Sequence, residues 1–160
     1  MKMFKQFLVI GILTILSLSF NKKTYAHCEI PCGIYEDTLR VELIKEHIVT
    51  IEKSMKMIIE LSKGETINYN QIVRWVNNKE EHAIKLQEIV SQYFLHQRIV
   101  PVSPENEEAY KKYIKQLTLL HELLVYSMKA KQTTDLAYID KLNNTINAFE
   151  DAYFHTHDHL

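Results

Sequence analysis

The residues best suited to chemistry lie in one short segment, His-Cys-Glu-Ile-Pro-Cys-Gly-Ile-Tyr, at positions 27–35. This segment contains both cysteines of the chain, Cys28 and Cys32, and His27 stands directly before the first of them. Two thiolates and an imidazole are donors that late transition metals accept readily. The proline and the glycine in the same stretch keep it from forming a helix. The segment is therefore the leading candidate for a metal site.

The preceding residues predict an export signal that is removed from the mature protein. Two lysines come before an uncharged apolar run over residues 7–20, which is too short to span a bilayer and is typical of a signal-peptide core. Thr24 and Ala26 then fit a small-x-small cleavage site. Cleavage after Ala26 would make residues 1–26 the signal peptide and would deliver the protein to a periplasm or the exterior, without stable membrane association. The alternative is an uncleaved membrane anchor.

Cleavage at this site would also enlarge the donor set. The α-amine of His27 would become free, and its pKa of about 8 allows it to lose its proton when a metal binds. The amine, the backbone amide nitrogen of Cys28 and the two thiolates can then surround one ion as a planar N₂S₂ set. Square-planar geometry suits Ni(II) or Cu(II), whereas zinc prefers a tetrahedron. These anionic donors, with the His27 imidazole as an axial ligand, would stabilise Ni(III), which predicts one-electron cycling of a single metal.

Two other interpretations of the segment remain open. Cys28 and Cys32 could form a disulfide, because exported cysteines are often paired, and the protein would then be a clamped structural bundle without bound metal. The same chelate could also serve a non-enzymatic nickel- or copper-binding protein.

Composition limits the classes of partner. The chain has 19 Lys and Arg against 20 Asp and Glu, but four of the lysines fall within residues 1–26. The remainder therefore carries 15 basic against 20 acidic residues, a net charge of −5. This balance argues against nucleic acid, which requires a basic surface. Only three glycines and no glycine-rich phosphate loop argue against nucleotide binding.

The residues after position 35 predict an all-α fold, an antiparallel four-helix bundle that must position the segment. Apolar side chains recur at helical spacing in four stripes: Ile44, Ile48, Ile51, Met55 and Ile58; Ile72, Val76, Ala83, Leu86, Val90 and Tyr93, interrupted by Lys79; Tyr110, Tyr113, Leu117, Leu120, Leu124 and Met128; and Leu136, Ile139, Leu142, Ile146, Phe149 and Tyr153. Residues 27–160 are expected to form one domain, with the bundle over about 36–154 and a histidine-rich tail over 155–160.

Capping residues predict where the helices begin and end. The expected boundaries are Gly64 after a first helix over about 37–62, Asn70 as the N-cap of the second helix, Ser103 as the N-cap of the third helix with Pro104 following, and Thr134 as the N-cap of the fourth helix with Asp135 following.

Two further groups of residues could in principle bind metal. Glu80, Glu81 and His82 are consecutive on the second predicted helix, but the Glu-x-x-His partner motif of a di-iron bundle is missing, so we interpret them as a mostly solvated face. The alternating histidines of the tail could hold a metal loosely, although we interpret the tail as a frayed terminus.

The segment resembles the His-Cys-x-x-Pro-Cys-Gly-x-Tyr nickel hook of the nickel-containing superoxide dismutases. Similarity to this family continues over most of the remaining chain. It includes Arg40-Val41-Glu42, Asn70-Gln71, Arg74-Trp75, Lys79-Glu80-Glu81-His82-Ala83, Tyr93-Phe94, Gln97-Arg98 and Tyr110-Lys111-Lys112-Tyr113. The resemblance implies a four-helix bundle, a homohexamer, a nickel cofactor and the conversion of superoxide to dioxygen and hydrogen peroxide.

The resemblance also implies roles for individual residues. Cys28 and Cys32 would supply sulfur ligands, and His27 would supply the amine and the axial imidazole. Tyr35 would stand over the open face of the nickel and admit only small anions, although it could instead be an ordinary packing aromatic. Glu42 would orient the imidazole of His27.

The last implications concern residues next to the ligands. Pro31 would shape the hook through a cis peptide bond. Glu29 stands where the family often has aspartate, and we expect this change to be tolerated. Asn78 occupies the place of the arginine that approaches the axial histidine in better-studied members, and Arg74 is a candidate to replace it.

Overall fold

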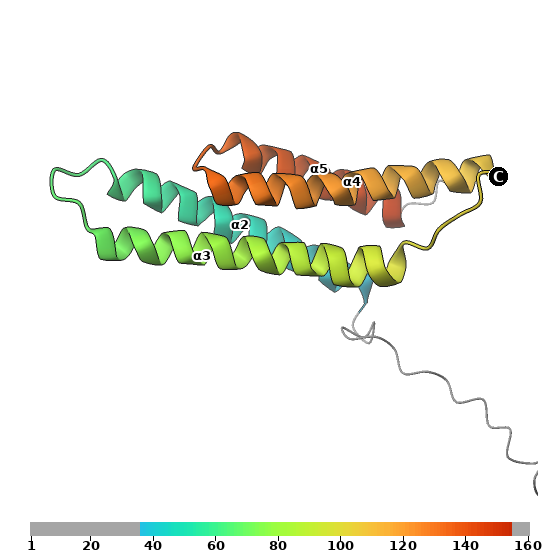
Figure 1. Ribbon diagram of the computed structural model, residues 1–160, viewed down its shortest axis with the longest axis horizontal. Helices are drawn as coiled ribbons and strands as arrows, with labels where there is room; N and C mark the ends of the chain where they lie inside the picture. Colours follow the sequence, from blue (N-terminus) through green and yellow to red (C-terminus); the bar gives the residue numbers. More distant parts are fainter. Residues whose placement is uncertain (1–35, 155–160) are drawn as a thin grey trace, which may run out of the picture.

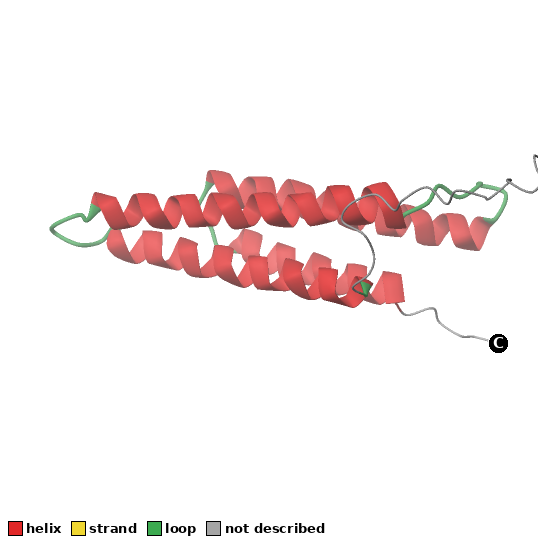
Figure 2. Cartoon of the chain, turned by 90° about the horizontal axis from the view of Figure 1, so that it is seen from below, coloured by secondary structure: helices red, strands yellow, loops and turns green. Residues whose placement is uncertain are grey.

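A computed structural model describes residues 36–154 and confirms the all-α bundle. Its helices are α2 (Asp37–Leu61), α3 (Tyr69–Glu88), the π-helix η1 (Ile89–Arg98) that continues α3, α4 (Glu107–Gln132) and α5 (Ala137–Phe154). Helix α2 packs mainly on α3 and α4 mainly on α5, and Figure 1 shows the two antiparallel pairs side by side. Helices and loops account for all the described residues, as Figure 2 shows. The predicted signal peptide, the hook and the histidine-rich tail lie outside them.

The stripe predicted on the first helix is confirmed. Its five apolar side chains, from Ile44 to Ile58, are all buried, and Val41 extends the stripe toward the start of α2. The buried residues of α5 also follow the predicted stripe, with Ile139, Leu142 and Phe149 in the core. Burial of such stripes is the main source of stability in an amphipathic bundle.

The stripe predicted on the third helix is confirmed in part, since Leu120 is buried while Tyr113, Leu117 and Leu124 pack against the core as partly buried side chains. The buried residues of α4 are Gln116, Leu120, Leu123, Ser127 and Ala130. Met128, which the apolar pattern placed inside, is 39% exposed. Gln116 donates a hydrogen bond from Nε2 to the carbonyl of Ala152 on α5 at 3.0 Å. Part of this buried face therefore consists of polar and small side chains. A search for apolar residues at helical spacing does not detect them.

Lys79, which interrupts the second stripe, is buried because it caps another helix. Its side chain is 4% exposed, and its Nζ donates to the carbonyls of Lys131 at 2.7 Å and Thr133 at 3.0 Å. These carbonyls lie at the C-terminal end of α4, where the helix dipole is negative. Burial lowers the pKa of Lys79. The residue that disrupts the apolar pattern thus joins α3 to the end of α4.

The predicted start of the second helix is wrong by a short distance. Asn68 rather than Asn70 is the N-cap, and its Oδ1 accepts from the backbone N–H of Gln71 at 3.2 Å. The first helix ends at Leu61, where the Ser62 hydroxyl donates to the carbonyl of Ile58, and Gly64 lies in the following turn. Asparagine is a good cap at either position, so packing against α2 decides between them.

The N-caps predicted for the last two helices are also displaced. Asn106 caps α4 by accepting from Ala109 N–H at 3.3 Å, while Ser103 belongs to the turn before it. Asp135 accepts from Ala137 N–H at 3.0 Å at the start of α5, in place of Thr134. Each displacement has the same cause, since several consecutive residues have side chains able to cap and the sequence does not rank them.

None of the described helices is both long enough and apolar enough to cross a membrane.

Candidate metal centre

The predicted ligands His27, Cys28 and Cys32, together with Pro31 and Tyr35, lie outside the described residues, so the structure does not test their positions. It does show where the segment joins the bundle, because Asp37 is the first residue of α2. Cys32 precedes Asp37 by five residues, and a chain extends at most about 3.6 Å per residue, so the two Cα atoms lie within about 18 Å. The start of α2 is therefore the part of the bundle that follows the proposed ligands most closely along the chain.

A hydrogen-bonded cluster surrounds Asp37 at this end of the bundle. Tyr93 from η1 donates its hydroxyl to Asp37 Oδ1, and Tyr153 from α5 donates to Oδ2 at 2.7 Å. Arg98 donates from Nε to Oδ1 at 3.0 Å and from Nη2 to the Tyr93 hydroxyl at 3.0 Å. Residues from η1 and α5 thus hold the first residue of α2. We call Asp37, Tyr93, Arg98 and Tyr153 the Asp37 cluster.

The π-helix explains how Tyr93 and Arg98 reach the same carboxylate. These residues are five positions apart, and a π-helix stacks positions at this spacing, as the hydrogen bond from Ile99 N–H to the Phe94 carbonyl shows. The Arg98 guanidinium lies 4.6 Å from the centre of the Tyr93 ring. A regular α-helix would turn the two side chains apart. The apolar spacing of the sequence predicts a helix here but does not predict its wider turn.

Aromatic side chains pack against the Asp37 cluster on its buried side. The Phe94 ring meets Phe149 edge-on with centroids 5.0 Å apart, and Phe149 stacks on Tyr153 at 5.4 Å. Phe94 and Phe149 are fully buried. The two tyrosine hydroxyls are therefore presented from a packed apolar base.

The cluster changes the acid–base properties of its members. Burial would raise the pKa of Asp37, but hydrogen bonds from Tyr93, Tyr153 and Arg98 outweigh it and lower the pKa. Burial and the bond to Asp37 raise the pKa of Tyr153 and of Tyr93. Asp37 is thus held as a carboxylate, and both tyrosines are held as neutral donors.

Arg40 brings a second guanidinium to the same place. Its Cζ lies 5.0 Å from the centre of the Tyr93 ring, which therefore has cationic groups from both Arg40 and Arg98 near it. The Nε of Arg40 is buried and has no hydrogen-bond acceptor among residues 36–154. Arg98 is already paired with Asp37 at 3.0 Å, so Arg40 brings a second positive charge to this end of the bundle.

Glu42, expected to orient the His27 imidazole, is paired with a lysine in the structure. Its side chain is 57% exposed and accepts from Lys45 Nζ at 3.0 Å. Lys45 also donates to Glu150 of α5 at 2.8 Å, and the bond to Glu150 raises the pKa of Lys45. The proposed role of Glu42 toward His27 stays a prediction, and it would require the carboxylate to be shared with Lys45.

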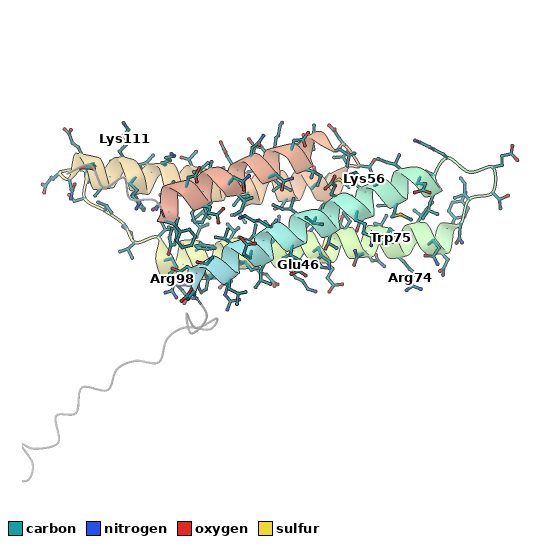
Figure 3. The ribbon with its side chains drawn as sticks, turned by 180° about the vertical axis from the view of Figure 1, so that it is seen from behind. Glu46, Lys56, Arg74, Trp75, Arg98 and Lys111 are labelled. Atoms are coloured by element: carbon teal, nitrogen blue, oxygen red, sulfur yellow. The ribbon has the colours of Figure 1, made fainter. Side chains whose placement is uncertain are left out.

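The predicted role of Arg74 beside the axial histidine stays a prediction, because His27 lies outside the described residues. Arg74 lies in the N-terminal half of α3, and Figure 3 shows it toward the opposite end of the bundle from Arg98. Asn78 donates from Nδ2 to the Ser54 hydroxyl at 2.9 Å within the α2–α3 contact. Arg40 and Arg98 lie together beside Tyr93 at the end where α2 begins, and only the helix pairing reveals this.

The interpretation of Glu80, Glu81 and His82 as a solvated face is correct only in part. Glu81 is exposed and pairs with Lys85 at 2.6 Å, while Glu80 lies 3.5 Å from Lys131. The ring of His82, by contrast, is half-buried and meets His47 of α2. Residues 36–154 contain no group of three or more histidine, cysteine or acidic side chains arranged to hold a metal.

Replacing Asp37 with Asn should destabilise the bundle and reduce its acid sensitivity. The amide cannot accept charge-assisted bonds from three donors, so we expect the free energy of unfolding to fall by about 2–3 kcal/mol at neutral pH. The folded-state pKa of Asp37 is lowered, so its contribution is present above the unfolded value near 3.9 and is lost as pH falls through the folded value. The difference between wild type and D37N should therefore shrink below about pH 4.

Urea unfolding of the metal-free protein between pH 3 and 7, followed by circular dichroism, measures this difference. Asp140→Asn, at an exposed position in the first turn of α5, is the matched control. Equal stability of D37N and wild type at neutral pH would contradict the role given to the cluster.

Comparison with protein families gives one match, which covers most of the chain. The family described as nickel-containing superoxide dismutase matches residues 22–157, a range that contains the donor segment and all the described helices. No curated protein and no solved structure matches the chain significantly.

Proposed function

The chain belongs to the nickel-containing superoxide dismutase family, and from this premise we propose that His27, Cys28 and Cys32 hold its nickel ion. The protein is an oxidoreductase that converts two superoxide ions and two protons to dioxygen and hydrogen peroxide. The observation that supports this ligand set is the position of the family match, which begins before His27 and includes every donor of the segment.

The donor chemistry of these residues fits nickel. The terminal amine of His27, the amide nitrogen of Cys28 and two thiolates would give an N₂S₂ set, which suits Ni(II) and would place strong anionic donors around the metal. Bound nickel would supply one-electron exchange between Ni(II) and Ni(III). The imidazole of His27 would be a further donor that favours the oxidised form. Because none of the proposed nickel donors lies on the helices, the helices only need to hold the segment in place.

The other residues of the segment shape the approach to the metal. Pro31 bends the chain so that Cys32 returns toward Cys28. Tyr35 stands at the entrance and restricts access to small anions, and Glu42 orients the imidazole of His27.

Charge supports a local rather than a global attraction of superoxide. After removal of residues 1–26 the protein has a net charge of −5, which repels an anion at long range. Arg40 of α2 and Arg98 of η1 lie beside Tyr93, at the end of the bundle that follows the ligands along the chain. Arg98 is paired with Asp37 at 3.0 Å, so Arg40 would supply the local positive charge where superoxide must enter.

Maturation and assembly complete the proposal. Export with cleavage after Ala26 would produce the free amine that the ligand set needs. A homohexamer, which the family resemblance implies, would cover exposed apolar side chains of the single chain. These include Val49, Tyr69, Val73 and Val100, which are 61%, 70%, 55% and 68% exposed.

Native and denaturing mass spectrometry of protein purified from its own export pathway tests the proposal. We expect a chain that begins at His27, one nickel per chain, six copies per assembly and rapid decay of superoxide. A residue retained ahead of His27 in active protein would contradict the proposed amine ligand. Bound nickel without superoxide-dependent redox cycling would favour the non-enzymatic metal-binding alternative, and oxidised thiols without metal would favour a structural disulfide.

A further inference from the structure

Two histidines meet across the contact between α2 and α3. His47 Nδ1 and His82 Nδ1 are 3.1 Å apart, and the rings are edge-on at 75° with centroids 5.0 Å apart. His47 lies between the buried residues Ile44 and Ile48 of α2, and His82 precedes the buried Ala83 of α3. The pair therefore flanks the buried seam between the two helices.

From this geometry we propose that His47 and His82 form a second metal site, which binds a late divalent transition-metal ion through both Nδ1 atoms. Such an ion lies about 2.0–2.1 Å from each imidazole nitrogen. With the nitrogens 3.1 Å apart, the angle at the metal is about 98°. This value lies between the roughly 90° of square-planar or octahedral sites and the roughly 109° of a tetrahedron. The two helices thus already hold the nitrogens at the separation that cis ligands require.

The protonation states available to the pair also favour metal binding. Without one, the pair can form a hydrogen bond only if one Nδ1 carries the proton and the other accepts it. Two imidazolium rings would place two N–H groups against each other. Burial and the charge of His82 lower the pKa of His47, which keeps the ring in the neutral form that metals bind.

The charged side chains around the pair do not exclude a cation by electrostatic repulsion. Glu46 and Lys85 are the charged side chains that act on His47, and they act in opposite directions. Lys85 is paired with Glu81 at 2.6 Å, which offsets much of its charge. Two imidazoles provide only half of a tetrahedral set, so water would complete the coordination. A divalent ion at this site would connect α2 to α3.

The test uses the full mature chain without the thiolates and the tail histidines, and the ring resonances of the retained His27 report any binding at the N-terminus. Cys28→Ser and Cys32→Ser eliminate the N-terminal thiolates, and His155→Gln, His157→Gln and His159→Gln eliminate the tail. Zinc is the probe because it is diamagnetic, and the readout is the ¹⁵N resonance of each histidine ring nitrogen. This background has no dismutase activity to lose, so the result is independent of the proposed function.

One equivalent of zinc should shift the Nδ1 resonances of His47 and His82 together and raise the melting temperature by at least about 3 °C. His47→Gln or His82→Gln should remove both effects, whereas His121→Gln, at an exposed position on α4, should retain them. Titration with nickel(II) and copper(II) then ranks the metals by affinity.

Nδ1 resonances that stay unchanged at millimolar zinc would overturn the site and would leave the pair as a hydrogen bond alone. Coordination through Nε2, or equal affinity in the single variants, would overturn it as well. The ring resonances of the background protein decide the question even if a histidine variant fails to fold.

Discussion

Replacing Cys28 or Cys32 with Ser should abolish dismutase activity while the bundle still folds. A hydroxyl is a weak donor to nickel, and loss of one thiolate removes the anionic sulfur that stabilises the oxidised metal. Activity should fall to the rate of uncatalysed superoxide decay. The apolar stripes of α2 and α5 lie elsewhere, so helicity and the urea midpoint of the metal-free protein should change little. Pulse radiolysis measures superoxide decay, and atomic emission measures nickel.

Ser54→Ala is a suitable control for loss of a polar side chain away from the metal. Ser54 is buried on α2 and accepts a hydrogen bond from Asn78, so its loss should affect stability but not nickel content. Unchanged turnover and nickel content in either cysteine variant would remove that thiolate from the ligand set. A large loss of stability in both variants, without a metal effect, would indicate a structural disulfide.

Replacing His27 with Ala should separate nickel binding from catalysis. The variant keeps the terminal amine, the Cys28 amide and both thiolates, so Ni(II) still has four planar donors. It loses the axial imidazole that stabilises Ni(III). Removing a residue that only hydrogen-bonds to a metal ligand lowers activity by up to roughly 100-fold. Removing the ligand itself should lower the rate of dismutation by more than that. Nickel content measured beside pulse-radiolysis rates should therefore stay near one per chain.

The matched variant adds one residue ahead of His27 and leaves every side chain in place. The amine then becomes a peptide nitrogen, and we expect weak nickel binding and no activity. Full activity of the extended protein would show that the free terminus is not a ligand. Full activity of His27→Ala would show that no axial imidazole is needed.

The fold was predictable because local patterns report burial in a bundle. Residues 44–58 repeat at helical spacing without interruption, and the structure buries all the apolar residues of that stripe. The third stripe was predicted only in part, because Gln116 and Ser127 are polar yet buried. Both find carbonyl partners, Gln116 on α5 and Ser127 within its own helix, and these partners are invisible in a hydropathy pattern.

The candidate site, like the fold, was predictable from the sequence only in part. The proposed ligands are contiguous, so their residue types and order predict a chelate without knowledge of the fold. The residues that support the segment are distant in sequence, because Asp37, Tyr93 and Tyr153 come together only through helix pairing. Arg98 joins them only through the π-helical turn.

The sequence by itself determined the class of fold and the family, and it predicts the donor set, because these depend on local spacing and on a contiguous motif. Tertiary structure decided which face of α4 turns inward, why Lys79 is tolerated in a core, and which arginines lie where α2 begins. It also placed His47 of α2 opposite His82 of α3, two residues that are far apart in the sequence. The physical reason is that hydrogen bonds and ring contacts between helices depend on rotation and register, which packing of the entire core sets and which no single helix encodes.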